Sequence, residues 1–227
     1  MKTFTKITSA VLLIAVFITA NAEQNKDQAL QALKSDLTIM ATPLTVAHTH
    51  TETVVKDDES TTTINRITPS NNPKWDLLSV NGKTPTKKDL KKFKKRMKKQ
   101  ADDEKEDPFV SILNLESLTH FSSTDEFEIF AFDPVFSAFK EESKKDIDGR
   151  VYVDKEGVIQ KIKINAPESF KPVFGATMNT FLLEYTVSYH LSRAYIEDHK
   201  LLIKAKVGGF KNLHMENSGT ITDINWQ

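Results

Sequence analysis

The chain has 227 residues, with 31 Lys and Arg against 31 Asp and Glu and no cysteine. This length suits one domain of about 200 residues or two small ones, and the lack of cysteine excludes disulfide frameworks, cysteine zinc sites and thiol catalysis. Hydrophobic residues make up 39% and charged residues 27%, which is the composition of a globular protein, neither disordered nor fibrous. We therefore expect a folded domain with its own core.

Residues 1–22 have the pattern of a secretory signal peptide. Lys2 and Lys6 precede an apolar run over residues 10–20, and Ala20-Asn21-Ala22 has the small residues of a cleavage site. The uncharged stretch is 16 residues long, shorter than a membrane span, although an uncleaved anchor is the alternative. With no disulfide and no Asn-X-Ser/Thr acceptor, these features predict a periplasmic protein cleaved after Ala22.

The first part of the remaining chain predicts one helix and then strands. Leu30, Leu33, Leu37 and Met40 form one helical stripe within residues 25–40. The period then changes to two over residues 46–54, residues 61–68 are rich in β-formers, and residues 75–80 form a short run before Asn81-Gly82. We expect an amphipathic helix followed by three strands.

A lysine-rich helix is predicted over residues 86–100. Thr86 and Asp89 form a capping-box pattern, and Leu90, Phe93 and Met97 make a narrow apolar stripe. Nine of the 13 residues from Lys87 to Lys99 are basic. Such a helix can bind an anionic membrane or an acidic partner. The alternative is a solvated helix neutralised by the acids that follow it at 102–107. The basic candidates are Lys87, Lys88, Lys91, Lys92, Lys94, Lys95, Arg96, Lys98 and Lys99.

The C-terminal half is mostly strand. Residues 109–118 are ambiguous, 127–132 form a strand, and 150–154 with 158–164 form a hairpin around Lys155-Glu156-Gly157. Residues 177–190 and 201–207 alternate strongly, Gly208-Gly209 ends the second run, and 220–226 forms a last strand. With no βαβ rhythm, the fold class is α+β: one strongly curved antiparallel sheet, an open half-barrel, covered by a few helices, in one domain over residues 23–227.

This pattern resembles the LolA/LolB-like periplasmic lipoprotein-sorting proteins. The resemblance rests on the signal peptide, the N-terminal helix, the long alternating strands and the loose string Arg66, Pro69 and Trp75. It implies a half-barrel with a helical lid, whose concave face holds acyl chains. This chain has no lipobox and adds the lysine-rich helix, so the resemblance implies a divergent member and not the sorting carrier itself.

A phenylalanine cluster is the first candidate ligand site. Six of the 14 phenylalanines fall within residues 121–139. Such a surplus of aromatic area can line an apolar pocket, although ordinary core packing is the alternative. The candidate ligand-binding residues are Phe127, Phe130, Phe132, Phe136, Phe139, Phe181, Leu183 and Tyr185.

Metal and catalytic sites have less support in the sequence. His48, His50 and Glu52 share one strand face, a spacing that can bind zinc or copper only with ligands from elsewhere. No HExxH, GxSxG, Walker A or Rossmann glycine motif is present. We therefore expect a non-enzyme without cofactor, metal or nucleic-acid partner. The expected function is binding of a lipid or other apolar ligand; the alternative is an interaction protein acting through the lysine-rich helix.

Overall fold

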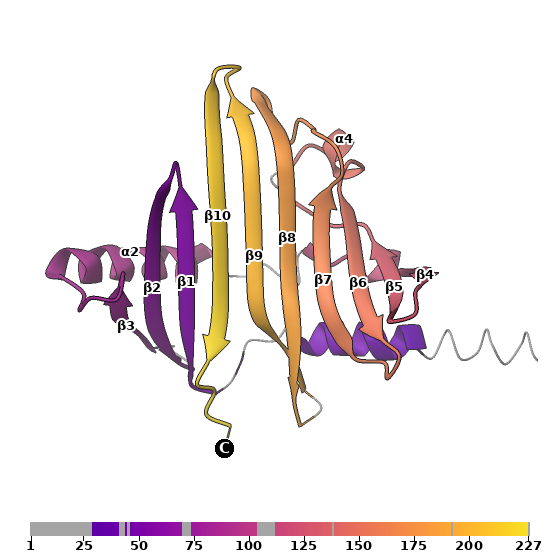
Figure 1. Cartoon of the computed structure of the whole chain (residues 1–227), viewed down its shortest axis with the longest axis horizontal. Helices are drawn as coiled ribbons and strands as arrows, with labels where there is room; N and C mark the ends of the chain where they lie inside the picture. Colours follow the sequence, from indigo (N-terminus) through magenta and orange to yellow (C-terminus); the bar gives the residue numbers. More distant parts are fainter. Residues whose placement is uncertain are drawn as a thin grey trace, which may run out of the picture.

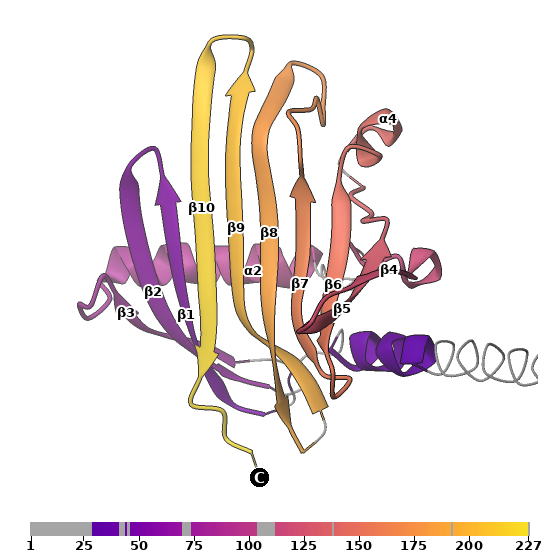
Figure 2. The same ribbon diagram turned by 45° about the vertical axis from the view of Figure 1, so that its right-hand side comes forward.

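The protein is built on one open antiparallel sheet of ten strands. A computed structural model describes residues 29–40, 44, 46–69, 74–103, 112–137, 139–191 and 193–226. The strands lie in the order β3-β2-β1-β10-β9-β8-β7-β6-β5-β4, and every neighbouring pair is antiparallel. Because β3 and β4 are the two edge strands, the sheet is open and does not close into a barrel. The sheet is also twisted and curved (Figures 1 and 2). This confirms the predicted fold class.

The three N-terminal strands are short and the three C-terminal strands are long. On the N-terminal side lie β1 (His48–Lys56), β2 (Glu59–Thr68) and β3 (Lys74–Val80). The other edge holds β4 (Thr119–Ser123), β5 (Phe127–Phe132), β6 (Asp148–Asp154) and β7 (Ile159–Ala166). Between them lie β8 (Ala176–His190), β9 (Arg193–Val207) and β10 (Lys211–Thr222). The helical elements among them are α2 (Lys87–Asp103), η1 (Leu115–Ser117) and α4 (Glu141–Lys144).

The chain path joins the first and last strands in the middle of the sheet. After β3 the chain leaves one edge through α2 and re-enters at the opposite edge with β4, from which each strand pairs with the next. The last strand, β10, then pairs with β1 from Thr49 opposite Thr222 to Lys56 opposite Met215. Residues 49–56 and 215–222, which are far apart in the sequence, therefore lie side by side.

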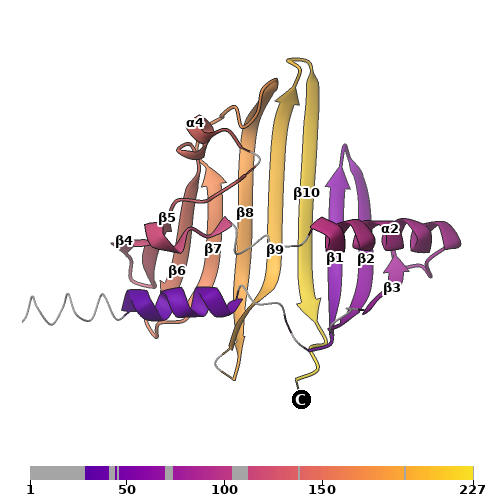
Figure 3. The same cartoon turned by 180° about the vertical axis from the view of Figure 1, so that it is seen from behind.

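Two helices cover the same face of the sheet, which we call the inner face (Figure 3). The N-terminal helix, residues 29–40, lies across β6–β8, and α2 lies across β1 and β2 (Figure 3). Leu33, Leu37 and Met40 of the N-terminal helix are buried in the main core, as the predicted stripe requires. Among the described residues, no helix combines the length and apolarity needed to span a bilayer.

The capping box predicted for α2 is present. The Asp89 carboxylate accepts hydrogen bonds from the backbone N–H and the hydroxyl of Thr86 at 2.9 and 2.6 Å, and the Asp89 N–H donates to Thr86 Oγ1 at 3.3 Å. These bonds satisfy backbone donors at the start of the helix. Phe93 is buried, whereas the described lysines of α2 are exposed. One aromatic side chain thus anchors a largely cationic helix.

Three sequence expectations need correction. The predicted last strand, 220–226, is displaced: β10 runs from Lys211 to Thr222, and residues 223–226 are not a strand. The strand expected at 201–207 begins earlier, at Arg193. The edge strand β4 was not predicted, because its sequence THFSS lacks apolar alternation. The predicted signal peptide, residues 1–22, lies outside the described residues.

Candidate functional site

The inner face changes from apolar to polar from one side of the sheet to the other. The change can be followed along a row that takes one directly opposed residue from each strand. This row runs through β5 to β8 and continues into β9, β10, β1 and β2. Because directly opposed residues share a face, all its members point toward the helices. In order they are Phe130, Val151, Ile162, Tyr185, His199, Gly219, Glu52 and Thr63. The apolar half lies near the N-terminal helix and the polar half near α2.

The apolar half is packed with side chains. Phe136 and Phe139, from the segment after β5, stack on each other with ring centroids 4.9 Å apart. Both also meet Phe181 edge to face, at 5.4 and 6.0 Å. Phe130 and Phe132 are buried in the same core. These are favourable aromatic geometries, so this cluster forms a core of interlocked rings.

The predicted ligand-binding residues therefore fall into two groups. Phe130, Phe132, Phe136, Phe139, Phe181, Leu183 and Tyr185 belong to or pack against the core. Phe127 differs, since it lies on the opposite face of β5 and contacts Tyr152, with ring centroids 6.0 Å apart. Phe127 thus cannot share one inner pocket with the others.

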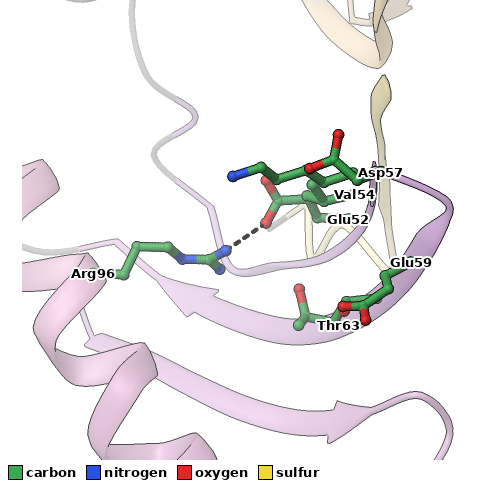
Figure 4. A pocket seen from close by; sticks show the side chains of 8 residues that line it. Glu52, Val54, Asp57, Glu59, Thr63 and Arg96 are labelled. Atoms are coloured by element: carbon green, nitrogen blue, oxygen red, sulfur yellow. Dashed lines mark hydrogen bonds and ion pairs between the residues drawn. The ribbon is translucent and has the colours of Figure 1, made fainter. Parts of the chain in front are cut away.

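A cavity of about 620 Å³ lies in the polar half, between α2 and the β1–β2 hairpin (Figure 4). We call it the α2 cavity. Seven of its residues come from β1, β2 and their connection, and one comes from α2. They are Glu52, Val54, Lys56, Asp57, Glu59, Thr61, Thr63 and Arg96. Its volume is within the range of small-molecule sites, about 300–1,000 Å³.

An ion pair forms the wall between α2 and the sheet. Arg96 Nη1 lies 3.0 Å from Glu52 Oε2, and the Glu52 side chain is only 17% exposed (Figure 4). Asn217 on β10 donates through Nδ2 to Glu52 Oε1 at 3.2 Å. Glu52 is therefore held from both sides, which positions Arg96 at the cavity.

Two polar atoms beside this ion pair are buried without a hydrogen-bond partner among the described residues. They are Thr63 Oγ1 and Asn217 Oδ1. A buried polar group that lacks a partner costs about 1–3 kcal/mol. Thr63 lines the cavity, and Asn217 lies next to Val54, another lining residue. Because neither atom is accessible to solvent, a bound molecule can supply a hydrogen bond to them only if neighbouring side chains move aside.

Two histidines lie against Gly219 next to Glu52. The rings of His50 and His199 stack with centroids 6.0 Å apart. A Cβ on residue 219 would overlap His50 Nε2 and His199 Cε1, so the rings occupy the space that a side chain would need. Burial lowers the pKa of His50 below 6.5; Glu52 opposes this shift, while His199, His48 and Arg96 add to it.

The lowered pKa of His50 predicts a pH-dependent stability. We expect the free energy of unfolding to fall as the pH drops below 6.5, because unfolded His50 takes up a proton that the folded site resists. Urea unfolding at about pH 7.5 and about pH 5.5 measures this difference, which is expected to be smaller in His50→Gln than in the wild type. An equal pH dependence in both proteins would assign the effect to other groups.

The histidine–glutamate row of β1 lies on the inner face, which His48, His50 and Glu52 share as expected. His48 Nδ1 lies 2.9 Å from the Val46 carbonyl oxygen, a hydrogen-bonding distance. In the described ranges, no three His, Asp or Glu side chains are arranged to hold a metal ion. The row belongs to the buried polar layer beneath α2.

A serine–histidine–glutamate cluster on β4 and β5 is a surface ion network. Ser123 Oγ donates to Glu128 at 2.5 Å, and His120 Nε2 lies 3.0 Å from the same carboxylate oxygen. In a catalytic triad the serine bonds to one imidazole nitrogen and the carboxylate to the other. In this cluster Ser123 Oγ, at 3.3 Å, and the Glu128 carboxylate both lie near the same nitrogen, His120 Nε2. Here Ser123, then Lys155 and His120, lower the pKa of Glu128 to about 2. The cluster thus stabilises an exposed carboxylate.

The cationic residues of α2 remain accessible. Lys87, Lys88, Lys91, Lys92, Lys94, Lys95, Arg96 and Lys98 are exposed. Within the described part of the chain, only Arg96 among them forms an ion pair. The side chain of Lys99 and the acids considered for neutralisation, 102–107, lie outside the described side chains. The exposed lysines form the surface that was predicted for an anionic partner.

The sequence alone did not identify most of the α2 cavity. Glu52 was singled out for a metal and Arg96 for an anionic partner, but their pairing across 44 positions was not foreseen. Lys56, Thr61 and Thr63 carried no motif. Comparisons with protein-family models, with curated proteins and with solved structures find no match to this chain.

Proposed function

We propose that the protein is a non-catalytic binding protein of the periplasm that holds a lipid-like amphiphile between α2 and the sheet. The observation that carries the proposal is the α2 cavity, which has ionic walls on one side and borders an apolar strip on the other. Its periplasmic location rests on the predicted signal peptide, and its role in envelope lipid handling rests on the resemblance to the LolA/LolB-like proteins.

The apolar strip begins at Met215 on β10, which pairs directly with the cavity residue Lys56, and continues on β9. Across the sheet, Val54 pairs with Asn217 and Asn217 with Leu201; in the next row, Lys56 pairs with Met215 and Met215 with Ile203. From β1 to β9, two strand spacings amount to about 10 Å. Leu201, Ile203 and Met215 are only half-buried, unlike the core residues beyond them. An apolar chain lying there would gain about 25 cal/mol for each Å² it buries.

The polar end of the ligand would lie in the cavity. Arg96 and Lys56 offer positive charge, and Thr63 contributes a hydroxyl that has no hydrogen-bond partner among the described residues. Glu52, Asp57 and Glu59 add three carboxylates. A head group that both accepts and donates hydrogen bonds suits this mixture better than a bare fatty-acid carboxylate. The ligand class is therefore a lipid with a polar, hydrogen-bonding head group.

Filling the cavity tests this function. We expect Thr63→Phe to weaken binding of a fluorescent lipid probe at least tenfold, because the ring occupies the cavity and removes the unpartnered hydroxyl. Thr62→Phe is the matched control, since Thr62 lies on the opposite face of the same strand and hydrogen-bonds to Thr53. Its affinity is expected to stay within about twofold of the wild type.

Native mass spectrometry of protein purified from its own periplasm provides the direct readout. The expected spectrum contains a bound lipid that is absent from Thr63→Phe. Repeated absence of lipid from the wild type, together with no uptake of the probe, would contradict the proposal. The same spectrum gives the mass of the processed chain, which the predicted cleavage places at Glu23 as the first residue.

A second candidate function is docking of α2 on an anionic surface. Its support is the set of exposed α2 lysines that form no ion pairs with other described residues. Changing Lys91, Lys92, Lys94 and Lys95 to Gln removes four of these charges without touching the residues that line the α2 cavity. If docking through α2 is the function, this variant loses its partner but still takes up the lipid probe.

A further inference from the structure

We infer that the end of the sheet formed by the β7–β8 and β9–β10 loops inserts into an anionic lipid bilayer through Phe174 and Phe210. Phe174 is 94% exposed and Phe210 is 86% exposed. Val173 and Val207 add exposed apolar surface beside them. We call these four residues the aromatic tip. The inference concerns a surface remote from the α2 cavity and does not depend on the proposed ligand.

The two loops form one unit. The Gly208 N–H donates to the Gly175 carbonyl at 2.8 Å, which ties the β9–β10 turn to the β7–β8 loop. Gly208 and Gly209 have φ values of +63° and +78°, a region that favours glycine, so this tight turn projects Phe210 from the end of the hairpin. Exposed apolar residues that occur singly are ordinary, but two joined loops that present four of them form a patch.

The shape of the tip favours a bilayer over a protein partner. The ends of β8, β9 and β10 project beyond the β1–β2 hairpin and beyond β7 (Figures 1 and 2). A stable protein interface needs about 800 Å² from each partner, which a projecting pair of loops does not supply by itself. Membrane-surface binding needs only a few apolar side chains inserted about 5–10 Å below the head groups.

Charge complementarity identifies the bilayer as anionic. Residues 199–215, which contain the β9–β10 turn, include four lysines and no Asp or Glu. The β7–β8 loop, residues 167–175, contains Lys171 and, at its start next to β7, Glu168. Lys140, which also pairs with Glu142, lies over the Phe174 ring with Nζ 5.9 Å from its centroid. Exposed aromatic rings with lysines beside them suit an interface where the rings enter the membrane and the ammonium groups meet anionic head groups.

Tryptophan substitution in the full chain tests the insertion directly. Phe210→Trp and Phe174→Trp are mixed with vesicles of phosphatidylglycerol and phosphatidylcholine, and spectra of the unsubstituted protein are subtracted to remove Trp75 and Trp226. We expect both added tryptophans to shift to shorter wavelength and to be quenched by brominated lipid. Leu191→Trp is the matched control, because Leu191 is 89% exposed in the β8–β9 turn at the opposite end of the sheet. It is expected to show neither change.

The affinity of the bilayer contact provides a second measurement. We expect each of Phe174→Ser and Phe210→Ser to weaken vesicle partitioning about tenfold, and Leu191→Ser to leave it unchanged. Unshifted tip tryptophans would overturn the inference, as would loss of vesicle binding in the α2 Lys→Gln variant with full binding in the Phe→Ser variants. Concentration-dependent dimerisation abolished by the Phe→Ser changes, without vesicle binding, would replace the bilayer with a second copy of the chain.

Discussion

Replacing Gly149 with alanine is expected to lower the free energy of unfolding by about 3 kcal/mol, because the sheet leaves no room for a methyl group there. A Cβ at this position would lie 2.7 Å from the Phe132 ring and 2.7 Å from the Phe132 carbonyl oxygen. Phe132 is directly opposite Gly149 on β5 and is only 4% exposed, so its ring has little space into which to move. The carbonyl belongs to the strand backbone, whose displacement would disturb the β5–β6 pairing.

A double-mutant cycle with Phe132→Leu identifies the source of that cost. Urea unfolding of the wild type, both single variants and the double variant gives the coupling energy. The double variant is expected to lose less stability than the sum of the single changes, since the smaller side chain removes the ring contact but not the carbonyl contact. Strictly additive losses would show that the ring does not limit the space at residue 149.

Alternation of apolar and polar residues correctly predicted those strands that have one buried face and one more exposed face. In β6 and β7, buried residues alternate with less buried ones, and the predicted turn between them is closed by Asp154 Oδ1, which accepts from Glu156 N–H at 3.0 Å and Val158 N–H at 2.9 Å. The alternation of β8 was equally clear. These strands cover the main core, so their inward positions are mostly filled by apolar side chains.

The last strand was predicted at residues 220–226 and not at its observed position in β10, because the inward face of β10 is partly polar. Its inward positions include Asn217 and Gly219, because β10 borders the polar half of the inner face and not the core. A strand that packs against a polar region has no apolar period, and local pattern analysis then finds only its last residues. The same absence of period hid β4 at the sheet edge. Polar strands were thus the weak point of the sequence prediction.

The candidate site could not be predicted, because it depends on pairings between distant segments. Glu52 meets Asn217 only because β1 pairs with β10, 165 positions later in the chain. Arg96 reaches Glu52 only because Phe93 anchors α2 on the inner face. The sequence did indicate the residue types, a histidine–glutamate strand and a basic helix. It contained no local signal for their being brought together.

The packing of the N-terminal helix leads to the second large effect. Leu37 is fully buried in the main core, and Leu33 and Met40 beside it are 5% and 6% exposed. The helix also approaches the end of β8, since the Asp36 carboxylate contributes to raising the pKa of Tyr189, after burial as the main cause. Leu37 is therefore the central contact between this helix and the sheet.

Leu37→Ala is expected to lower the free energy of unfolding by about 3 kcal/mol, because it removes buried carbon atoms and leaves a cavity between helix and sheet. Ile39→Ala is the matched control: it removes the same number of carbon atoms from the same helix at a position that is 38% exposed, and it is expected to cost less than about 1 kcal/mol. Urea unfolding measures both. Because the residues that line the α2 cavity come from β1, β2 and α2, folded Leu37→Ala should still bind the lipid probe with wild-type affinity. Weakened binding at full folding would instead mean that the N-terminal helix forms part of the ligand site, with the amphiphile reaching from the α2 cavity across β9 into the main core.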